Sequence, residues 1–557
     1  MKKALPIGSD DFARIRNDDY YYVDKTLLIK DFIEFHNEVT LITRPRRFGK
    51  TLNMTMLREF FDITQDSKAI FEGLAIMETE YSVRINSQPV IYFSFKDCTG
   101  KTPDTLKLRL MKELRKEYAR FATVFENGID QTNYDIVIFN KNFEHLSNES
   151  VDFGGLSSYI EDLVRAVHSY FHSTPILLLD EYDQPILSSY EYGYREELSD
   201  FFAVLYGSAL KGNEHLGQAL LTGIQRVAKE SIFSCLNNVL TYTVSQKEYS
   251  AYFGLTMEET GELLEYYGLQ LNESVIEQYD GYRMGGYEMF NPWSILNYAW
   301  SKELENYWIN TSTNYLIRQS LLQADDAFRE KFEQLIISGS TNVMASLTTS
   351  LIELKTNSTL WGLLVNSGYI TIEEKITNEY MKVRIPNDEV KSEFQKIVAE
   401  QIAIQDDDLT EMFYCLLHKD MTGFCSVYRK IVLTCTSYFD SEPENEKKEN
   451  GHFTPKENAY HMLFLGMCIS IRNIYEITSN LESGYGRHDI RLKARKPGYA
   501  HIILEFKQGK ELEKLKEDAL NQIFEQQYYA GLSGSVLCIG IAHNQKRCEM
   551  AYREFVV

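Results

Sequence analysis

The sequence predicts a multidomain α/β protein, and three stretches support that prediction. Residues 39–51 read as a short apolar strand, a loop and the start of a helix. Residues 175–181 (Pro-Ile-Leu-Leu-Leu-Asp-Glu) form an apolar strand that ends in two acids. Residues 489–507 contain two strands around a Lys-Pro-Gly turn signal. The first two stretches predict a parallel sheet in the N-terminal half, and the third predicts a separate C-terminal α/β domain.

Length, charge and cysteine usage limit the class of protein. A chain of 557 residues predicts roughly two to four domains. A formal charge of −22 implies that a polyanion would bind only at local basic patches. The eight cysteines contain no Cys-x-x-Cys pair, so neither a disulfide framework nor a zinc knuckle is predicted. With no signal-peptide pattern and no membrane-spanning apolar run, we expect a cytoplasmic protein without a membrane partner.

The loop at residues 44–51 (Arg-Pro-Arg-Arg-Phe-Gly-Lys-Thr) ends in Gly-Lys-Thr, which matches the last three residues of the phosphate-binding P-loop motif. A helix N-terminus presents free N–H groups and a positive dipole to an anion. Lys50 is expected to reach the outer phosphates, and the Thr51 hydroxyl is expected to ligate Mg²⁺. The general motif expects glycine where Arg44 stands, so a basic loop that caps a helix is the alternative interpretation. Nucleotide binding therefore needs a second motif.

The apolar strand at residues 175–181 supplies that second motif. A continuously apolar strand is typical of the centre of a parallel sheet covered on both faces. Acids at its carboxyl end lie where ligands bind in α/β folds. Asp180 is expected to hold the Mg²⁺ shell, and Glu181 is expected to polarise the attacking water, as in a Walker B strand. The alternative is a strand that simply ends in polar residues.

Residues 5–240 resemble the bacterial AAA-ATPase-like family in several blocks. The blocks are Tyr-Val-Asp-Lys-Thr at 22–26, the P-loop at 44–51, Leu-Asp-Glu-Tyr-Asp-Gln-Pro at 179–185 and Leu-Thr-Gly-Ile-Gln-Arg-Val-Ala-Lys-Glu-Ser-Ile-Phe at 221–233. Arginine is common at the first P-loop position of this family. The resemblance implies an ASCE/AAA-like P-loop NTPase sheet with ATP and Mg²⁺ as cofactors. The residues it implies for nucleotide binding are Arg44, Phe48, Gly49, Lys50, Thr51 and Asp180.

Two further residues and a tyrosine run in this half are candidates for nucleotide contacts. Thr222 is placed like the polar sensor residue that reads the γ-phosphate in AAA-type ATPases. Arg226 can contact a phosphate in its own subunit or in a neighbouring one, which leaves a homo-oligomer open; a structural salt bridge is the equal alternative. The tyrosines at 20–22 precede the P-loop strand and can line an adenine pocket or pack at the edge of the core.

The remainder of the chain divides into three parts after a first domain at 1–240. Residues 241–436 carry amphipathic segments of helix length, for example 256–267, 293–300, 314–322 and 409–417, and predict a mostly helical lid or connector. Residues 437–458 are polar and charged without periodicity, which indicates a linker or exposed loop. Residues 459–557 form the last domain.

The last domain contains a candidate metal site on two neighbouring strands. If residues 489–494 and 501–507 pair as a hairpin, Asp489 lies beside Glu505, and Lys507 shares the face of Glu505. An acid on each of two strands offers oxygen ligands to Mg²⁺ or Mn²⁺. Such an ion generates hydroxide and offsets the charge of a scissile phosphate, while Lys507 stabilises the developing anion. A solvated, charged strand face is the alternative.

The expected order αβββαβ resembles the restriction-endonuclease-like PD-(D/E)XK nuclease domain that the same family often carries at its C-terminus. The resemblance implies that Asp489, Glu505 and Lys507 are catalytic and that Gln522 is the accessory residue on the helix. It also implies nucleic acid, with DNA as the first choice, as the partner of this domain. Local positive charge comes from Arg487, Arg491, Lys493, Arg495 and Lys496.

Together these motifs predict a bacterial hydrolase with two coupled sites. One is a P-loop site that binds and hydrolyses ATP, and the other is a Mg²⁺- or Mn²⁺-dependent nuclease site. In that hypothesis the nucleotide controls the access of nucleic acid to the C-terminal site. The alternative is a nucleotide-dependent switch or interaction module whose nuclease-like domain does not cleave.

Overall fold

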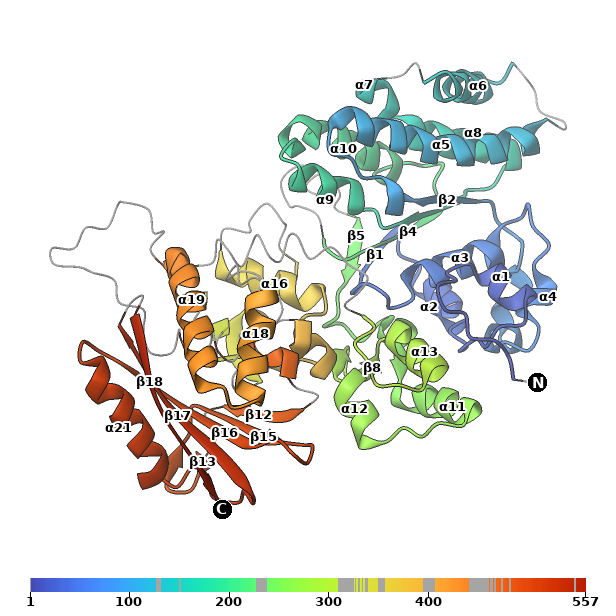
Figure 1. Ribbon diagram of the computed structural model, residues 1–557. Coiled ribbons are helices and arrows are strands. Elements are labelled where there is room, and N and C mark those ends of the chain that lie inside the picture. The colour runs from blue at the N-terminus through green and yellow to red at the C-terminus, as the bar shows by residue number, and fades with distance from the viewer. Residues whose placement is uncertain are drawn as a thin grey trace. The chain divides into compact units, whose positions relative to one another are not determined.

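A computed structural model describes most of the chain as two compact units (Figure 1). The first unit comprises Met1–Lys331 and Ser340–Val390, and the second comprises Phe332–Gly339 and Lys391–Val557. The residues that the structure describes are 2–126, 132–149, 152–226, 238–308, 325, 327–328, 331–332, 334–335, 339–348, 356–393, 406–439, 460, 464, 467–471, 474–479, 482–544 and 547–557.

A five-stranded parallel sheet organises the first unit. Its strands are β1 (Val39–Thr43), β2 (Val90–Ser94), β3 (Ile176–Asp180), β4 (Gln218–Gly223) and β5 (Val239–Tyr242). The spatial order is β2-β3-β4-β1-β5, so β4 lies between the P-loop strand and the strand that ends in Asp180. Every residue of β1, β3 and β4 is buried, as the apolar runs predicted. The carboxyl ends of these three strands therefore meet at one edge of the sheet.

Helices cover both faces of this sheet (Figure 1). On one face the apolar side chains of the strands pack with α5 (Pro103–Phe125), α8 (Tyr159–Phe171) and α10 (Arg195–Leu210) in one buried cluster. On the other face lie α2 (Leu27–Phe35) and α3 (Lys50–Phe61), the helix that follows the P-loop. The remaining helices of this region are α1 (Phe12–Asn17), α4 (Lys68–Phe71), α6 (Tyr134–Ser147), α7 (Phe153–Leu156) and α9 (Gln184–Glu191).

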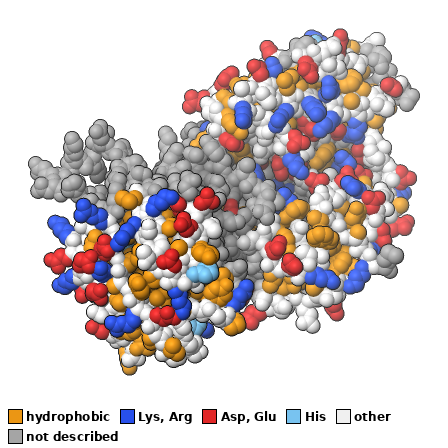
Figure 2. Space-filling view, in the orientation of Figure 1, with side chains coloured by type: hydrophobic (Ala, Val, Ile, Leu, Met, Phe, Trp, Pro, Cys, Tyr) orange, Lys and Arg blue, Asp and Glu red, His pale blue; other side chains and the backbone are white. Residues whose placement is uncertain are grey.

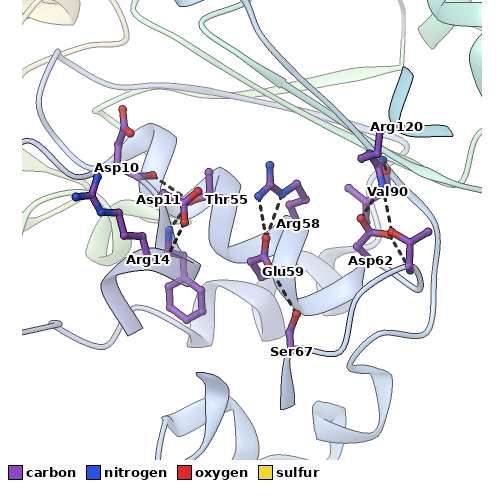
Figure 3. A network of polar contacts seen from close by, with 12 residues as sticks. Asp10, Asp11, Arg14, Thr55, Arg58, Glu59, Asp62, Ser67, Val90 and Arg120 are labelled. Atoms are coloured by element: carbon purple, nitrogen blue, oxygen red, sulfur yellow. Dashed lines mark hydrogen bonds and ion pairs between the residues drawn. The ribbon is translucent and has the colours of Figure 1, made fainter. Parts of the chain in front are cut away.

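Polar contacts fix α3 at its middle and at its C-terminal end (Figure 3). The Thr55 hydroxyl accepts from the Phe12 amide and donates to the Asp10 carbonyl, each at 3.1 Å. Near its C-terminal end, Arg120 of α5 donates to the Asp62 carboxylate at 2.9 Å. Arg120 also donates to the carbonyl of Val90, which begins β2. The P-loop helix is thereby held to the N-terminal segment and to the sheet at once.

The rest of the first unit contains more strand than the sequence predicted for a connector. One antiparallel sheet joins β6 (Leu255–Thr256), β8 (Tyr287–Phe290) and β7 (Tyr282–Met284). Another joins β10 (Thr371–Lys375), β11 (Tyr380–Arg384) and β9 (Ser340–Met344). These strands have two to five residues, too short for an alternating pattern to stand out from the helix-length segments around them.

Two of the expected helices in this segment are present as predicted. They are α11 (Met257–Tyr267), which begins with a capping box at Thr256, and α13 (Pro292–Ser301). The expected helix at 314–322 lies outside the described residues. The structure also contains α12 (Glu273–Tyr279) and α16 (Asn357–Asn366).

A mixed five-stranded sheet organises the second unit, in the order β12-β15-β16-β17-β18. Its strands are β12 (Tyr475–Ser479), β15 (Ile490–Ala494), β16 (His501–Gln508), β17 (Ser535–Asn544) and β18 (Arg547–Val556). Only β16 and β17 pair in parallel, and α21 (Leu512–Glu525) connects them. The four strands and the helix expected in 475–541 are therefore present. The structure adds β18 and a small hairpin, β13 (Glu482–Ser483) with β14 (Gly486–Arg487).

Helices α18 (Asp406–Leu417) and α19 (Met421–Phe439) belong to this second unit, whereas the sequence placed them in the connector. Arg429 of α19 donates to the carbonyl of Cys548 in β18 at 3.1 Å. The expected first helix of the domain, at 460–471, and the expected linker lie mostly outside the described residues. Among the described helices, none is long and apolar enough to cross a membrane.

Substituting Gly540 in β17 by alanine is expected to destabilise the second unit by about 1–3 kcal/mol, because a side chain there overpacks the contact with α21. A Cβ atom on Gly540 would lie 2.4 Å from the Lys516 carbonyl oxygen and 2.5 Å from the Leu520 amide nitrogen. The matched control is Gly207→Ala in α10, where a Cβ meets nothing within 4 Å. The control should hold or raise the free energy of unfolding, as measured in urea. Equal stability of Gly540→Ala and wild type would contradict the packing described here.

Candidate nucleotide and nuclease sites

The P-loop is a tight turn from β1 into α3 that encloses the side chain of Lys50. Gly49 has φ +81°, a left-handed conformation that glycine adopts without strain. The Lys50 Nζ donates to the carbonyls of Arg44 at 3.1 Å and Pro45 at 3.0 Å. Burial lowers the pKa of Lys50, while the nearby carboxylates of Glu181 and Asp180 oppose that shift. The loop therefore holds an ammonium group at the N-terminus of a helix, where an anion binds.

Arg44 supports the P-loop from within the core, and its guanidinium group does not face the phosphate position. The side chain is fully buried and donates to the carbonyls of Thr43 at 2.8 Å and Tyr242 at 2.9 Å. It also donates to the hydroxyl of Ser250 at 3.2 Å and lies over the ring of Phe253. The arginine therefore ties β1 to β5 at the start of the loop, and nucleotide binding by Arg44 stays a prediction.

Thr51, Asp180 and Thr222 meet at the carboxyl edge of the parallel sheet. The Thr51 hydroxyl donates to Asp180 Oδ2 at 2.7 Å, and the Thr222 hydroxyl donates to Asp180 Oδ1 at 2.6 Å. The hydroxyl of Ser94 lies 3.5 Å from the same carboxylate. A hydroxyl and a carboxylate this close fit Mg²⁺, which takes few protein oxygens and completes its shell with water and phosphate. Thr222 contacts Asp180 and so positions the carboxylate.

Glu181 stands beside Lys50 in a strained backbone conformation. Its φ of +49° is left-handed, which is uncommon for a residue other than glycine and is often found at functional sites. Burial raises the pKa of Glu181, the Lys50 ammonium lowers it, and the neighbouring Asp180 and Asp183 raise it. This acid directly follows Asp180 at the carboxyl edge of the sheet.

The two remaining nucleotide candidates take different places. Phe48 packs edge-on against Tyr282, with ring centroids 5.0 Å apart. Together with Gly49, Phe48 lines an apolar cavity of about 90 Å³ beside the P-loop, to which Tyr21 and Tyr22 also contribute. Arg226 is half-buried and follows the end of β4 by three residues, next to a segment outside the described residues.

Two residues support the site without having been assigned a role from the sequence. Asp183 is buried and accepts the backbone amides of Ile224 at 2.8 Å and Gln225 at 2.9 Å, which fixes the loop after β4. Asp183 lies within the Asp-Glu-Tyr-Asp run at 180–183, so the sequence contained a signal for it. Glu389 stands more than 200 residues further along the chain, and no motif marks it.

Glu389 lies behind the P-loop in a chain of hydrogen bonds. Its buried carboxylate accepts from the Trp308 amide and from the Ser294 hydroxyl, each at 2.8 Å. The indole of Trp308 donates to the Arg46 carbonyl of the P-loop at 3.4 Å. Burial raises the pKa of Glu389 to about 7, although these hydrogen bonds lower it.

The second candidate site lies where β15, β16 and α21 meet. Because Ile490 pairs with Leu504, Asp489 stands opposite Glu505, as the hairpin prediction required. The Asp489 amide donates to Glu505 Oε2 at 3.4 Å. The Phe506 amide, in turn, donates to Asp489 Oδ2 at 2.7 Å.

Two further side chains complete this second site. The Lys507 Nζ lies 3.8 Å from Glu505 Oε1. The Gln522 amide nitrogen donates to the same oxygen, and at 3.1 Å to the hydroxyl of Tyr528. The structure therefore brings together Asp489, Glu505, Lys507 and Gln522, all four of the residues that the sequence proposed.

The charges of this site fit a divalent cation. Glu505 is 3% exposed, and burial raises the pKa of Asp489 against the lowering by the Phe506 amide and Lys507. A buried acid and a half-buried acid placed together are costly unless a cation offsets them. Among the described residues, no group of three His, Cys, Asp or Glu side chains converges on such an ion. Mg²⁺ commonly takes one or two carboxylates and completes its shell with water and phosphate, so the pair suffices.

The parallel sheet of the first unit is consistent with a P-loop-like domain, and the second unit contains a C-terminal mixed sheet that carries the acid pair. Comparison with known families agrees: residues 6–233 match the family described as predicted AAA-ATPase, and residues 455–552 match the PD-(D/E)XK nuclease superfamily. The chain thus carries a predicted AAA-ATPase-like domain and, C-terminal to it, a PD-(D/E)XK nuclease superfamily domain.

One similar protein comes from Azotobacter chroococcum mcd 1 and is described as an uncharacterized protein in the vnfD 5′ region. The two chains are 28% identical over 464 residues, which cover 81% of this chain and 80% of the other. The similarity therefore extends beyond either domain alone.

The Glu389→Gln variant tests the support behind the P-loop through its pH dependence. The folded-state pKa of about 7 is higher than the ordinary 4.5, so the folded protein keeps this proton where the unfolded chain has lost it. The raised pKa of Glu389 contributes fully to the free energy of unfolding below about pH 4.5. This contribution decreases as the pH rises to 7, by on the order of 3 kcal/mol at most. In denaturant unfolding between pH 5 and pH 8, the variant should lose less stability than wild type. Parallel pH profiles for the two proteins would contradict this assignment.

Proposed function

We propose that this protein binds and hydrolyses ATP in its first unit and cleaves nucleic acid phosphodiesters in its second unit with Mg²⁺ or Mn²⁺. The observation that supports this function most directly is the convergence of Asp489, Glu505, Lys507 and Gln522 from two strands and a helix. We take DNA as the nucleic acid, a homo-oligomer as one possible state and the cytoplasm as the location.

In the nuclease site each residue has a distinct task. Asp489 and Glu505 would hold the metal ion, which supplies hydroxide and offsets charge on the scissile phosphate when it is bound. The Phe506 amide orients Asp489, and Gln522 orients Glu505. Lys507 places its ammonium beside the acids, where it stabilises the negative charge that develops on the phosphate.

In the nucleotide site Lys50 would contact the outer phosphates, and Thr51 with Asp180 would hold the Mg²⁺ ion of ATP. Glu181 would orient the attacking water, and the strained conformation at this residue supports that role. A nucleobase bound beside the loop would lie near the apolar side chains of Phe48, Tyr21 and Tyr22.

Nucleic acid would bind through local charges. On the face shown in Figure 2, Lys and Arg side chains are interspersed with Asp and Glu side chains over both units. With a net charge of −22, long-range attraction of a polyanion is weak, and contacts near the active site must supply the affinity.

The direct test is cleavage of plasmid and single-stranded DNA with Mg²⁺ or Mn²⁺, with and without ATP, by wild type and Asp489→Ala. Metal-dependent cutting that is lost in the variant supports the nuclease, and ATP dependence shows coupling between the sites. ATP turnover without cutting under any condition would instead support the alternative, a nucleotide-dependent switch whose nuclease-like domain does not cleave.

The Lys507→Ala variant should cut roughly a hundredfold more slowly than wild type while still binding ATP, because only the ammonium group of Lys507 is lost. Its control is Lys510→Ala, which removes an exposed lysine just after the same strand. Initial cleavage rates under saturating metal measure the effect. A wild-type rate for Lys507→Ala would show that the site is assigned incorrectly.

The Lys50→Ala variant should lose the increase in melting temperature, roughly a few degrees, that Mg²⁺-ATP gives wild type. Cleavage measured without ATP should persist, since Lys50 lies in the first unit. The surface variant Lys30→Ala, whose side chain only approaches Glu34 at 3.8 Å, should respond to ATP like wild type. If Lys50→Ala kept the full thermal shift, nucleotide binding at this loop would be ruled out.

A further inference from the structure

The small hairpin of β13 and β14 stands directly before the acid pair in the chain (Figure 1). Its turn is Gly484-Tyr485, and Asp489 follows Tyr485 by four residues. The side chain of Tyr485 is 77% exposed, one of the most exposed large apolar side chains that the structure describes. Single exposed rings are ordinary on protein surfaces, so the fixed position of its hairpin is what distinguishes Tyr485.

The hairpin is held firmly against the turn that follows α21. The Tyr485 amide donates to the Gln526 carbonyl at 2.8 Å. The Ser483 hydroxyl donates to the Tyr528 carbonyl at 2.9 Å and accepts from Arg491 at the same distance. The ring of Tyr485 is therefore exposed on a backbone whose position relative to the end of α21 is fixed.

The glycines of the hairpin explain how it comes so close. Gly484 has φ +63°, and a Cβ there would lie 2.1 Å from the Gln526 carbonyl oxygen. On Gly486, a Cβ would lie 3.3 Å from the hydroxyl of Tyr528. Only residues without side chains allow this approach, so the hairpin is specifically shaped to lie against the 526–528 turn.

A short chain of contacts leads from the hairpin to the acid pair. Gly486 approaches the hydroxyl of Tyr528, which accepts from Gln522 at 3.1 Å. The same Gln522 nitrogen donates to Glu505. Tyr485 is the chain neighbour of Gly486, which packs near the hydroxyl of Tyr528. Two hydrogen bonds link that hydroxyl through Gln522 to Glu505. The hairpin therefore lies at the end of α21, the helix that carries Gln522.

We propose that Tyr485 is a substrate-positioning residue that stacks on an unpaired nucleobase next to the scissile phosphate, so that the nuclease site prefers single-stranded nucleic acid. This inference rests on the proposed nuclease function. A single exposed ring can stack only on a base that has left its duplex partner, because paired bases already stack on their neighbours. Stacking also suits an acidic protein, since it supplies affinity that does not depend on a wide basic surface.

The test measures binding apart from cutting. Anisotropy of a fluorescein-labelled single-stranded oligonucleotide and of the matching duplex is followed in Ca²⁺ for wild type, Tyr485→Ala, Tyr485→Trp and Tyr552→Ala. Tyr552 on β18 is the control, a 53% exposed tyrosine on the edge strand two places from β16 in the sheet. Tyr485→Ala should weaken single-strand binding by roughly tenfold, whereas Tyr485→Trp and Tyr552→Ala should stay within about twofold of wild type.

Duplex binding should change by less than about twofold in Tyr485→Ala, and in Mg²⁺ its KM for the single strand should rise with little change in kcat. Equal single-strand affinities for wild type and Tyr485→Ala would overturn the proposal, as would an equal loss for single strand and duplex. Tyr485-dependent binding without any cutting by wild type would support the stacking site and reject the nuclease. If wild type cuts the single strand and Tyr485→Ala has the same KM and affinity, the nuclease is supported and the stacking site is rejected.

Discussion

The buried carboxylate of Asp180 is the group on which the first unit depends, because a charge inside a sheet must be satisfied by its neighbours. It ends β3 and accepts hydroxyl hydrogens from Thr51, which opens the P-loop helix, and from Thr222 on β4. These donors come from positions 129 and 42 residues away in the chain. The parallel register of β1, β4 and β3 alone brings them together. The same geometry that satisfies the acid also assembles a hydroxyl and a carboxylate that suit Mg²⁺.

In the second unit, backbone amides donate hydrogen bonds to the carboxylates of the site. Asp489 and Glu505 stand opposite each other on antiparallel strands, and the amides of Phe506 and Asp489 donate to their oxygens. Gln522 reaches the same pair from α21, whose close approach to the sheet requires Gly540 on β17. Two acids held together in this way have unfavourable repulsion, which a bound cation would relieve. Fold and chemistry are linked here because the same contacts position the two acids and bring Lys507 beside them.

The candidate sites were largely predictable because their residues lie in short, local patterns. Gly-Lys-Thr at a helix start, an apolar strand ending in Asp-Glu, and two alternating strands around a turn each express chemistry within a few residues. Arg44 shows the limit of that reasoning. Its type and position suggested an anion contact, yet the guanidinium faces the core because carbonyls at the end of β5 accept its hydrogens. Glu389 and the short strands β6–β11 had no local signal, since burial and pairing with distant segments define them.

The sequence by itself determined the element types of the two sheet domains, the motif residues and the pairing of Asp489 with Glu505, because strand periodicity and a turn signal specify the register of a hairpin. Only the tertiary structure decided which unit the helices α18 and α19 join, that β18 extends the second sheet, and that Tyr485 is presented on a fixed hairpin. These features depend on packing between residues far apart in the chain, such as Gly484 against Gln526. Local patterns carry no record of such contacts, whereas steric fit and buried hydrogen bonds in the folded chain select them.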